Sequence, residues 1–118
     1  MLMVDAHLDL AMNAVMWNRD LALSEHETRR IERDEGFTEK GRCAGTVGFP
    51  DLWAGEVGLV FATVIARKNH GQNADIDFRT HEIAFAQAQG QLAYYQVLER
   101  QGIIRIIRTR DDLVLCHA

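Results

Sequence analysis

The sequence has only two cysteines, one proline and no apolar run as long as a membrane span. The few cysteines and the missing span argue against a disulfide-rich protein and a membrane-spanning protein. Cys43 and Cys116 are far apart, so there is no C-x-x-C motif, and we expect two reduced thiols rather than a disulfide scaffold. No stretch approaches the roughly 20 apolar residues of a membrane span. The first residues also lack the charged and apolar regions of a signal peptide. We therefore expect a cytoplasmic protein with no membrane partner.

A basic stripe is also lacking. The formal net charge is −4, and the longest charged stretch, Glu25 to Lys40, mixes both signs. We therefore expect no nucleic-acid partner. The chain has 118 residues, of which 47% are hydrophobic and 25% charged, as in an ordinary globular domain. This length is enough for one domain at most.

Strands and helices alternate along the sequence. A continuous apolar run rich in β-branched residues, at 57–66, is typical of a parallel strand buried on both faces. The predicted elements are a strand at 2–8, an irregular surface insert at 20–56, a strand at 57–66, a helix at 78–101, a strand at 103–107 and a helix starting at 109. Such alternation predicts a parallel α/β architecture.

Local signals place the ends of two of the helices. Ser24 and Glu27 form a capping box that starts a short polar helix, and Gly36 ends it. Thr80 or Asp77 caps the long helix, and Gly102 follows its end. Gly90 in the middle of that helix costs about 1 kcal/mol relative to alanine, which predicts a packing reason or a kink there.

His7 and Asp9 are the main candidates for chemistry, because they follow the apolar residues of the first strand. Side chains two apart on a strand share a face, and an imidazole beside a carboxylate suits zinc. Functional groups of parallel sheets gather at the C-terminal ends of strands. Asp5 lies on the same face and is a candidate partner that would hold a ligand by a hydrogen bond.

The His-x-Asp spacing alone is not specific, because about 0.4 such pairs are expected by chance at this composition. A histidine and an aspartate in an ordinary strand-end turn explain it equally well. His70 follows the second strand and is a weaker candidate, since a solvated loop histidine is the commoner case. His81 begins the long helix, where the helix dipole disfavours a cation, so we interpret it as structural.

Three segments, in order, resemble the membrane (renal) dipeptidase family of zinc peptidases. The first is Asp5-Ala6-His7-Leu8-Asp9-Leu10, the second runs from Phe49 to Ala62, and the third from Ile103 to Leu113 with its Thr-Arg-Asp-Asp-Leu ending. The similarity spans essentially the whole chain. Met12 departs from the pattern, because relatives often carry an aromatic residue just after the aspartate.

The resemblance implies the N-terminal part of a TIM-like (β/α)8 barrel with a two-zinc site, in which His7 and Asp9 bind one zinc ion. It implies a metallo-dipeptidase that hydrolyses dipeptides or related small amides through a metal-activated water. A complete barrel needs about 250 residues. We therefore expect residues 1–118 to be a single partial domain, inactive by itself, whose apolar faces are covered by the rest of the barrel or by a second copy.

Two alternatives remain open at this point. The first alternative is a complete small α/β interaction module that forms homodimers without catalysis, with His7 and Asp9 in structural roles. A relative of the amidohydrolases with another substrate, such as a cyclic amide or lactam, is the third interpretation.

Overall fold

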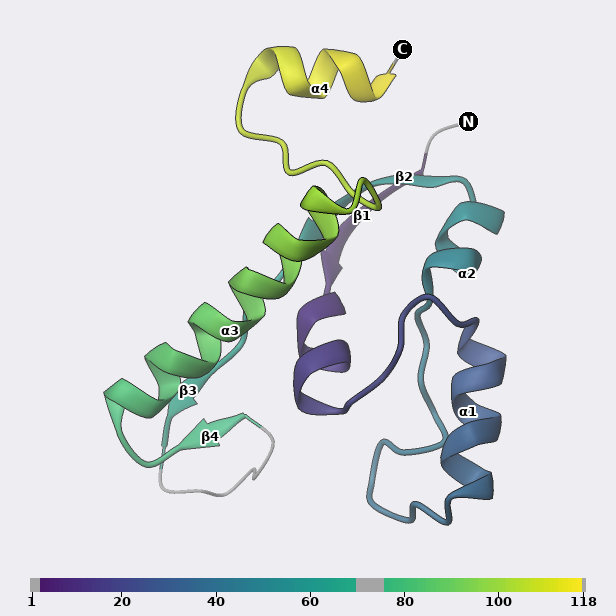
Figure 1. Ribbon diagram of the computed structural model, residues 1–118, viewed down its shortest axis with the longest axis vertical. Coiled ribbons are helices and arrows are strands. Elements are labelled where there is room, and N and C mark those ends of the chain that lie inside the picture. The colour runs from purple at the N-terminus through teal and green to yellow at the C-terminus, as the bar shows by residue number, and fades with distance from the viewer. Residues whose placement is uncertain (1–2, 70–75, 118) are drawn as a thin grey trace.

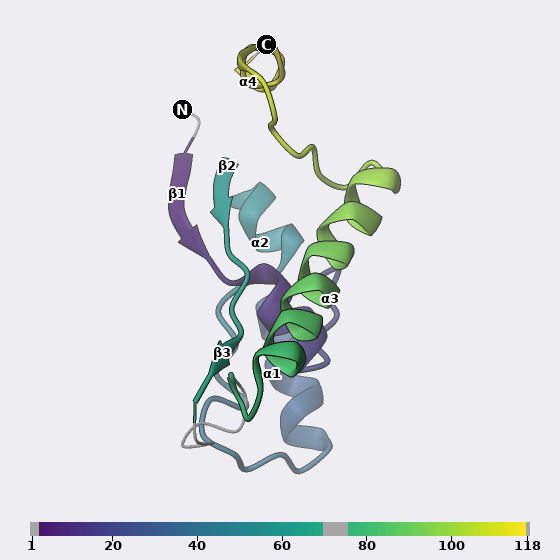
Figure 2. The same cartoon turned by 90° about the vertical axis from the view of Figure 1, so that its left-hand side faces the viewer.

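Two of the predicted strands form a parallel pair in the computed structural model, which describes residues 3–69 and 76–117. Strand β1 (Met3–Leu8) lies beside β2 (Val57–Ala62), and their arrows point the same way in Figure 2. Leu2, the predicted start of β1, lies outside the described residues. The second strand ends at Ala62, four residues earlier than predicted, and residues 63–66 continue it without ladder pairing.

A second, smaller parallel pair follows, which the sequence did not predict. It joins β3 (Arg67–Lys68) to β4 (Asp77–Phe78). Together the two pairs make a small mixed helix–strand domain, and no closed barrel is formed by the described residues.

Within the described residues, five helical elements accompany the strands (Figure 1). They are the π-helical segment η1 (Met12–Met16), α1 (Glu25–Asp34), α2 (Phe49–Ala54), α3 (His81–Arg100) and α4 (Arg110–His117). In both ribbon views α3 runs past the end of the β1–β2 pair and alongside η1, while α4 stands apart near the start of β1.

The helix-end signals of the sequence are confirmed. Ser24 and Glu27 make the reciprocal capping box, and Gly36 ends α1 with φ of 76°. The side chain of Thr80 caps α3, and Gly102, with φ of 73°, ends it. The packing reason predicted for Gly90 was wrong, because a Cβ placed there meets no atom within 4 Å apart from the local helix backbone. The helix α3 runs unbroken through this position.

The predicted strand at 103–107 was also wrong. These residues are irregular, and the amide of Ile106 donates to the side chain of Glu99 at 3.1 Å instead of to a neighbouring strand. An apolar β-branched run needs a partner backbone to become a strand. None of the strands in the described residues pairs with residues 103–107, so this run remains irregular.

The core sits between η1, α3 and the segment 20–56. Its buried members are Leu10, Ala11, Leu21, Val47, Phe49, Tyr95 and Leu98. Three of these seven come from the segment predicted to be a surface insert. That segment therefore anchors both of its ends in the core, while its middle forms a polar lobe around α1.

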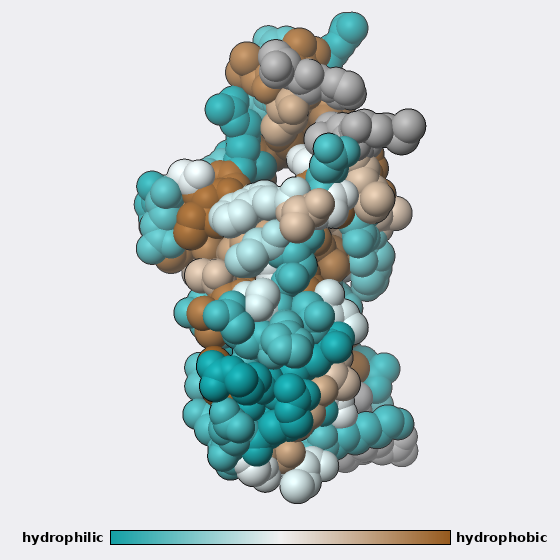
Figure 3. Space-filling view, turned by 90° about the vertical axis from the view of Figure 1, so that its right-hand side faces the viewer, coloured by the Kyte–Doolittle hydropathy of each residue, from teal (hydrophilic) through white to brown (hydrophobic). Residues whose placement is uncertain are grey.

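Much apolar surface remains uncovered. Trp53 and Phe61 are 64% and 63% exposed, on α2 and β2. A hollow of about 660 Å³ lies between α2, β2, residues 103–107 and α4, with an almost entirely apolar lining. Figure 3 shows hydrophilic side chains over the half of the molecule that holds α1, and hydrophobic patches over the other half. Among the described helices, none is long and apolar enough to cross a bilayer.

Candidate metal centre

The candidate site lies where β1 and β2 both end. Because the strands are parallel, Leu8 and Ala62 lie at the same edge and pair with each other. Residues that follow either strand are therefore brought together, although they are more than 50 positions apart in the sequence. The polar residues at this edge are His7 and Asp9 from the first strand and Thr63 from the second.

His7 and Asp9 point toward one another, as the His-x-Asp spacing predicts. The distance between His7 Nε2 and Asp9 Oδ1 is 3.3 Å, and the two side chains are 73% and 33% exposed. The imidazole is therefore accessible, whereas the carboxylate is partly enclosed. This geometry suits an ion pair when the histidine is protonated, and it also suits two ligands that share one cation.

Asp5 contacts His7 through the backbone. Its Oδ1 accepts a hydrogen bond from the amide of His7 at 2.9 Å. The same stretch carries an irregularity, because three residue steps from Asp5 to Leu8 oppose two steps from Val60 to Ala62. Such a bulge redirects the side chains beside it. Asp5 thus supports the conformation that presents His7, and this bond leaves the imidazole nitrogens uninvolved.

Thr63 binds the carboxylate of Asp9 from the second strand. Its hydroxyl donates to Asp9 Oδ1, and its amide donates to the carbonyl of Leu8 at 3.1 Å. No sequence motif pointed to Thr63. One signal was available, since Thr63 is the polar member of the apolar run 57–66 and falls where a parallel strand ends.

Tyr95 joins the two strand ends from α3. Its hydroxyl donates to the carbonyl of Thr63 at 2.8 Å and accepts from the amide of Ala11 at 3.1 Å. The side chain is buried, and burial raises the pKa of the phenol, with the nearby charge of Asp9 acting in the same direction. Tyr95 therefore stays protonated and remains a donor. No motif in the sequence pointed to Tyr95.

Asn13 connects the site to the polar lobe. Its side chain donates to the carbonyl of Asp9 at 2.8 Å and accepts from Arg19 at 2.6 Å. Arg19 in turn donates through Nε to Glu32 at 2.8 Å. The backbone carbonyl of Asp9 is therefore linked by a chain of hydrogen bonds, through Asn13 and Arg19, to Glu32 on α1.

The donor set fits part of a zinc site. Two donors bound to one tetrahedral zinc ion, at about 2.0–2.1 Å each, lie about 3.4 Å apart. The measured separation of His7 Nε2 and Asp9 Oδ1, 3.3 Å, agrees with this. A nitrogen and an oxygen donor are also the types that zinc accepts. Within residues 3–69 and 76–117, however, no three His, Cys, Asp or Glu side chains gather around one point.

Two other histidines were weaker candidates in the sequence. His81 is exposed at the first position of α3. His70 lies outside the described residues.

No family model matches this sequence, and it has no match among curated proteins or solved structures.

Proposed function

We propose that this chain is the N-terminal part of a zinc-dependent dipeptidase, which hydrolyses dipeptides or related small amides. In this proposal His7 and Asp9 supply two ligands of a two-metal site, and the parallel β1–β2 pair begins a TIM-like barrel. The remaining ligands come from segments beyond this chain. By itself the chain then has no peptidase activity and binds zinc weakly.

One observation carries the proposal: the 3.3 Å separation of His7 Nε2 and Asp9 Oδ1 at the C-terminal edge of a parallel strand pair. That edge is where parallel α/β folds place their functional groups. The ordered resemblance of three segments to the dipeptidase family supports the same conclusion. In such a site bound zinc activates a water molecule and polarises the scissile carbonyl.

The residues of this chain have separate tasks in that reaction. His7 and Asp9 hold the ion by a neutral nitrogen and a charged oxygen. Asp5 fixes the backbone of His7, and Asn13 fixes the carbonyl of Asp9. The partial enclosure of the Asp9 carboxylate strengthens its attraction to a cation, because fewer waters screen it.

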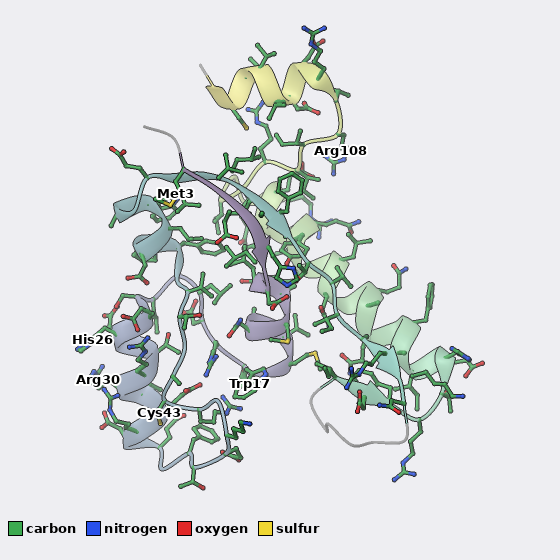
Figure 4. The ribbon with its side chains drawn as sticks, turned by 180° about the vertical axis from the view of Figure 1, so that it is seen from behind. Met3, Trp17, His26, Arg30, Cys43 and Arg108 are labelled. Atoms are coloured by element: carbon green, nitrogen blue, oxygen red, sulfur yellow. The ribbon has the colours of Figure 1, made fainter. Side chains whose placement is uncertain are left out.

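Zinc titration by calorimetry tests the proposal. We expect the wild-type chain to bind Zn²⁺, and His7→Ala to lose most of this binding. His26→Ala is the matched control, because His26 is an exposed histidine on α1, away from the strand ends (Figure 4). Equal zinc affinity of His7→Ala and wild type would contradict the role of His7.

The reading frame beyond Ala118 tests the dipeptidase identity separately. The proposal requires a glutamate at the end of the next apolar strand and two histidines further downstream. A stop codon directly after Ala118 in the natural gene would refute it.

A second candidate is a homodimeric α/β interaction module without catalysis. The exposed apolar residues of α2 and β2, and the hollow beside them, favour this function, because monomers rarely leave such patches open. Mass spectrometry of the natural protein separates the two candidates. A native mass of 13.4 kDa per chain supports the module, and a mass near that of a whole barrel supports the dipeptidase.

A further inference from the structure

We propose that Thr63 is a positioning residue for the metal ligand Asp9, and that Tyr95 holds Thr63 in place. This inference rests on the proposed function, and it assigns a role to two residues for which sequence motifs gave no function. Its basis is a continuous set of hydrogen bonds that runs from α3 through the end of β2 to the carboxylate.

The hydroxyl of Thr63 lies near two acceptors, the carbonyl of Leu8 and the carboxylate of Asp9. A hydroxyl has one proton to donate. Its oxygen is 3.4 Å from the neutral carbonyl of Leu8, near the limit of a hydrogen bond, and it also contacts Asp9 Oδ1, whose charge makes it the stronger acceptor. The proton is therefore directed at the carboxylate.

Thr63 itself is held in a fixed conformation. As a β-branched residue it is stiff about χ1. Its amide is bound to the carbonyl of Leu8, and its carbonyl accepts from Tyr95. The backbone is thus held on both sides, so the hydroxyl has a fixed place from which to orient Asp9.

The hydroxyl of Tyr95 is hydrogen-bonded to both chain segments that follow the strands. The phenol oxygen accepts from Ala11, two residues after Asp9, and donates to Thr63. It therefore fixes the separation of the two chain segments on which the carboxylate and its donor are mounted. Because the ring is 5% exposed, water does not compete for these bonds.

The consequence concerns affinity for the metal. A carboxylate that is already oriented loses less freedom when it binds an ion, and residues that orient ligands typically contribute 10- to 100-fold to metal affinity. The hydroxyl of Thr63 leaves a second lone pair on Oδ1 available, because a carboxylate oxygen accepts two bonds.

The experiment compares zinc affinities by calorimetry in three threonine variants. Thr63→Val removes the hydroxyl but keeps the shape, Thr63→Ser keeps the hydroxyl, and Thr38→Val is the matched control at an exposed threonine. We expect Thr63→Val to bind Zn²⁺ about 10-fold more weakly, and the other two to stay within about twofold of wild type. Circular dichroism establishes that each variant is folded.

The outcomes separate this inference from the proposed function. If Thr63→Val binds zinc as wild type does, or Thr63→Ser is as weak as Thr63→Val, the positioning role is refuted while the role of His7 stands. If His7→Ala leaves zinc binding unchanged, both fall. If Thr63→Val does not fold, Tyr95→Phe replaces it, and wild-type zinc affinity in that variant overturns the inference.

Discussion

Glu32 ties together three segments that are distant in the sequence. Its carboxylate accepts from Arg19 at 2.8 and 3.1 Å, from Arg42 at 3.0 Å and from the amide of Cys43 at 2.6 Å. Arg19 and Arg42 also lie over the ring of Trp17, each 4.8 Å from its centre. Glu32, from the mixed-charge stretch 25–40, thus lies at the centre of the polar lobe together with Arg19 and Arg42. Figure 4 labels Trp17 and Cys43, which contact this cluster.

The first prediction concerns Glu32 and pH. Burial alone would raise its pKa, but the hydrogen bonds from Arg19, Cys43 and Arg42 outweigh this and lower it from 4.5 to about 2. Folding therefore favours the ionised form. Its contribution, about 3 kcal/mol, is complete above pH 4.5 and is lost as the pH falls toward 2.

Urea unfolding of wild type and Glu32→Gln at several pH values measures this effect. We expect the variant to be less stable at pH 7 and the difference to shrink below pH 4.5. Glu35→Gln, an exposed neighbour on the C-terminal side of α1, serves as the control. A difference that does not change with pH would contradict the assignment.

Among the elements, α3 organises the strand ends. Two buried polar side chains one turn apart, Gln91 and Tyr95, both face the segment that follows β2. Gln91 accepts from the amide of Ile65 at 2.9 Å and donates to its carbonyl at 2.7 Å. Residues 63–66 are predicted to be β but are not part of a strand ladder. For Ile65, the side-chain amide of Gln91 supplies the hydrogen bonds that a neighbouring strand would otherwise make.

The second prediction follows from that replacement. Gln91→Leu removes both partners of Ile65, and we expect it to lower the free energy of unfolding by about 2 kcal/mol. Gln89→Leu, at an exposed position of the same helix, controls for the change in side-chain type. Urea unfolding measures the loss, and hydrogen exchange locates it. An Ile65 amide that stays protected in Gln91→Leu would contradict the prediction.

The third prediction concerns the middle of α3. A methyl group at Gly90 meets open space, so Gly90→Ala gains helix propensity without a steric cost. We expect about 1 kcal/mol of stabilisation, read as a higher Tm. At Gly102, where φ is 73°, the same substitution lowers the Tm, because alanine is strained in that region. A lower Tm in Gly90→Ala would show that the glycine is needed.

The sequence predicted the elements whose signals are local. The capping box at Ser24, the glycines that end α1 and α3, and the parallel direction of β1 and β2 are all confirmed. Features that depend on distant partners were missed. The run 103–107 has a strand's composition but no partner, and the bond between Thr63 and Asp9 joins residues 54 positions apart. A single sequence carries no record of which residues meet across such distances.

As a whole, the molecule is more open than a compact domain of its size. Its Cα radius of gyration is 15.5 Å, whereas a compact domain of this length has about 13.5 Å. Its accessible surface is 8094 Å², whereas about 6500 Å² is typical of this mass. The excess surface includes the apolar residues of α2 and β2, which supports the proposal that another chain or segment covers them.

The fourth prediction concerns this surface. We expect the isolated chain to self-associate in sedimentation experiments through the hollow beside β2, and Phe61→Lys to shift it toward the monomer, because a charge there resists burial. Ile83→Lys is the control, since Ile83 is 46% exposed on α3 and does not line the hollow. Equal effects of the two substitutions would contradict a specific surface.

The bond pattern of Tyr95 also determines when the site forms during synthesis. The ribosome releases β1 with His7 and Asp9 first, and no partner strand exists until β2 follows. Thr63 then reaches Asp9, but the hydrogen bond from Tyr95 to Thr63 forms only after α3 has been synthesised. A nascent chain therefore exposes its candidate ligands early and orders them late. If the proposed zinc site is correct, it is therefore fully ordered only after α3 has packed against the strand ends.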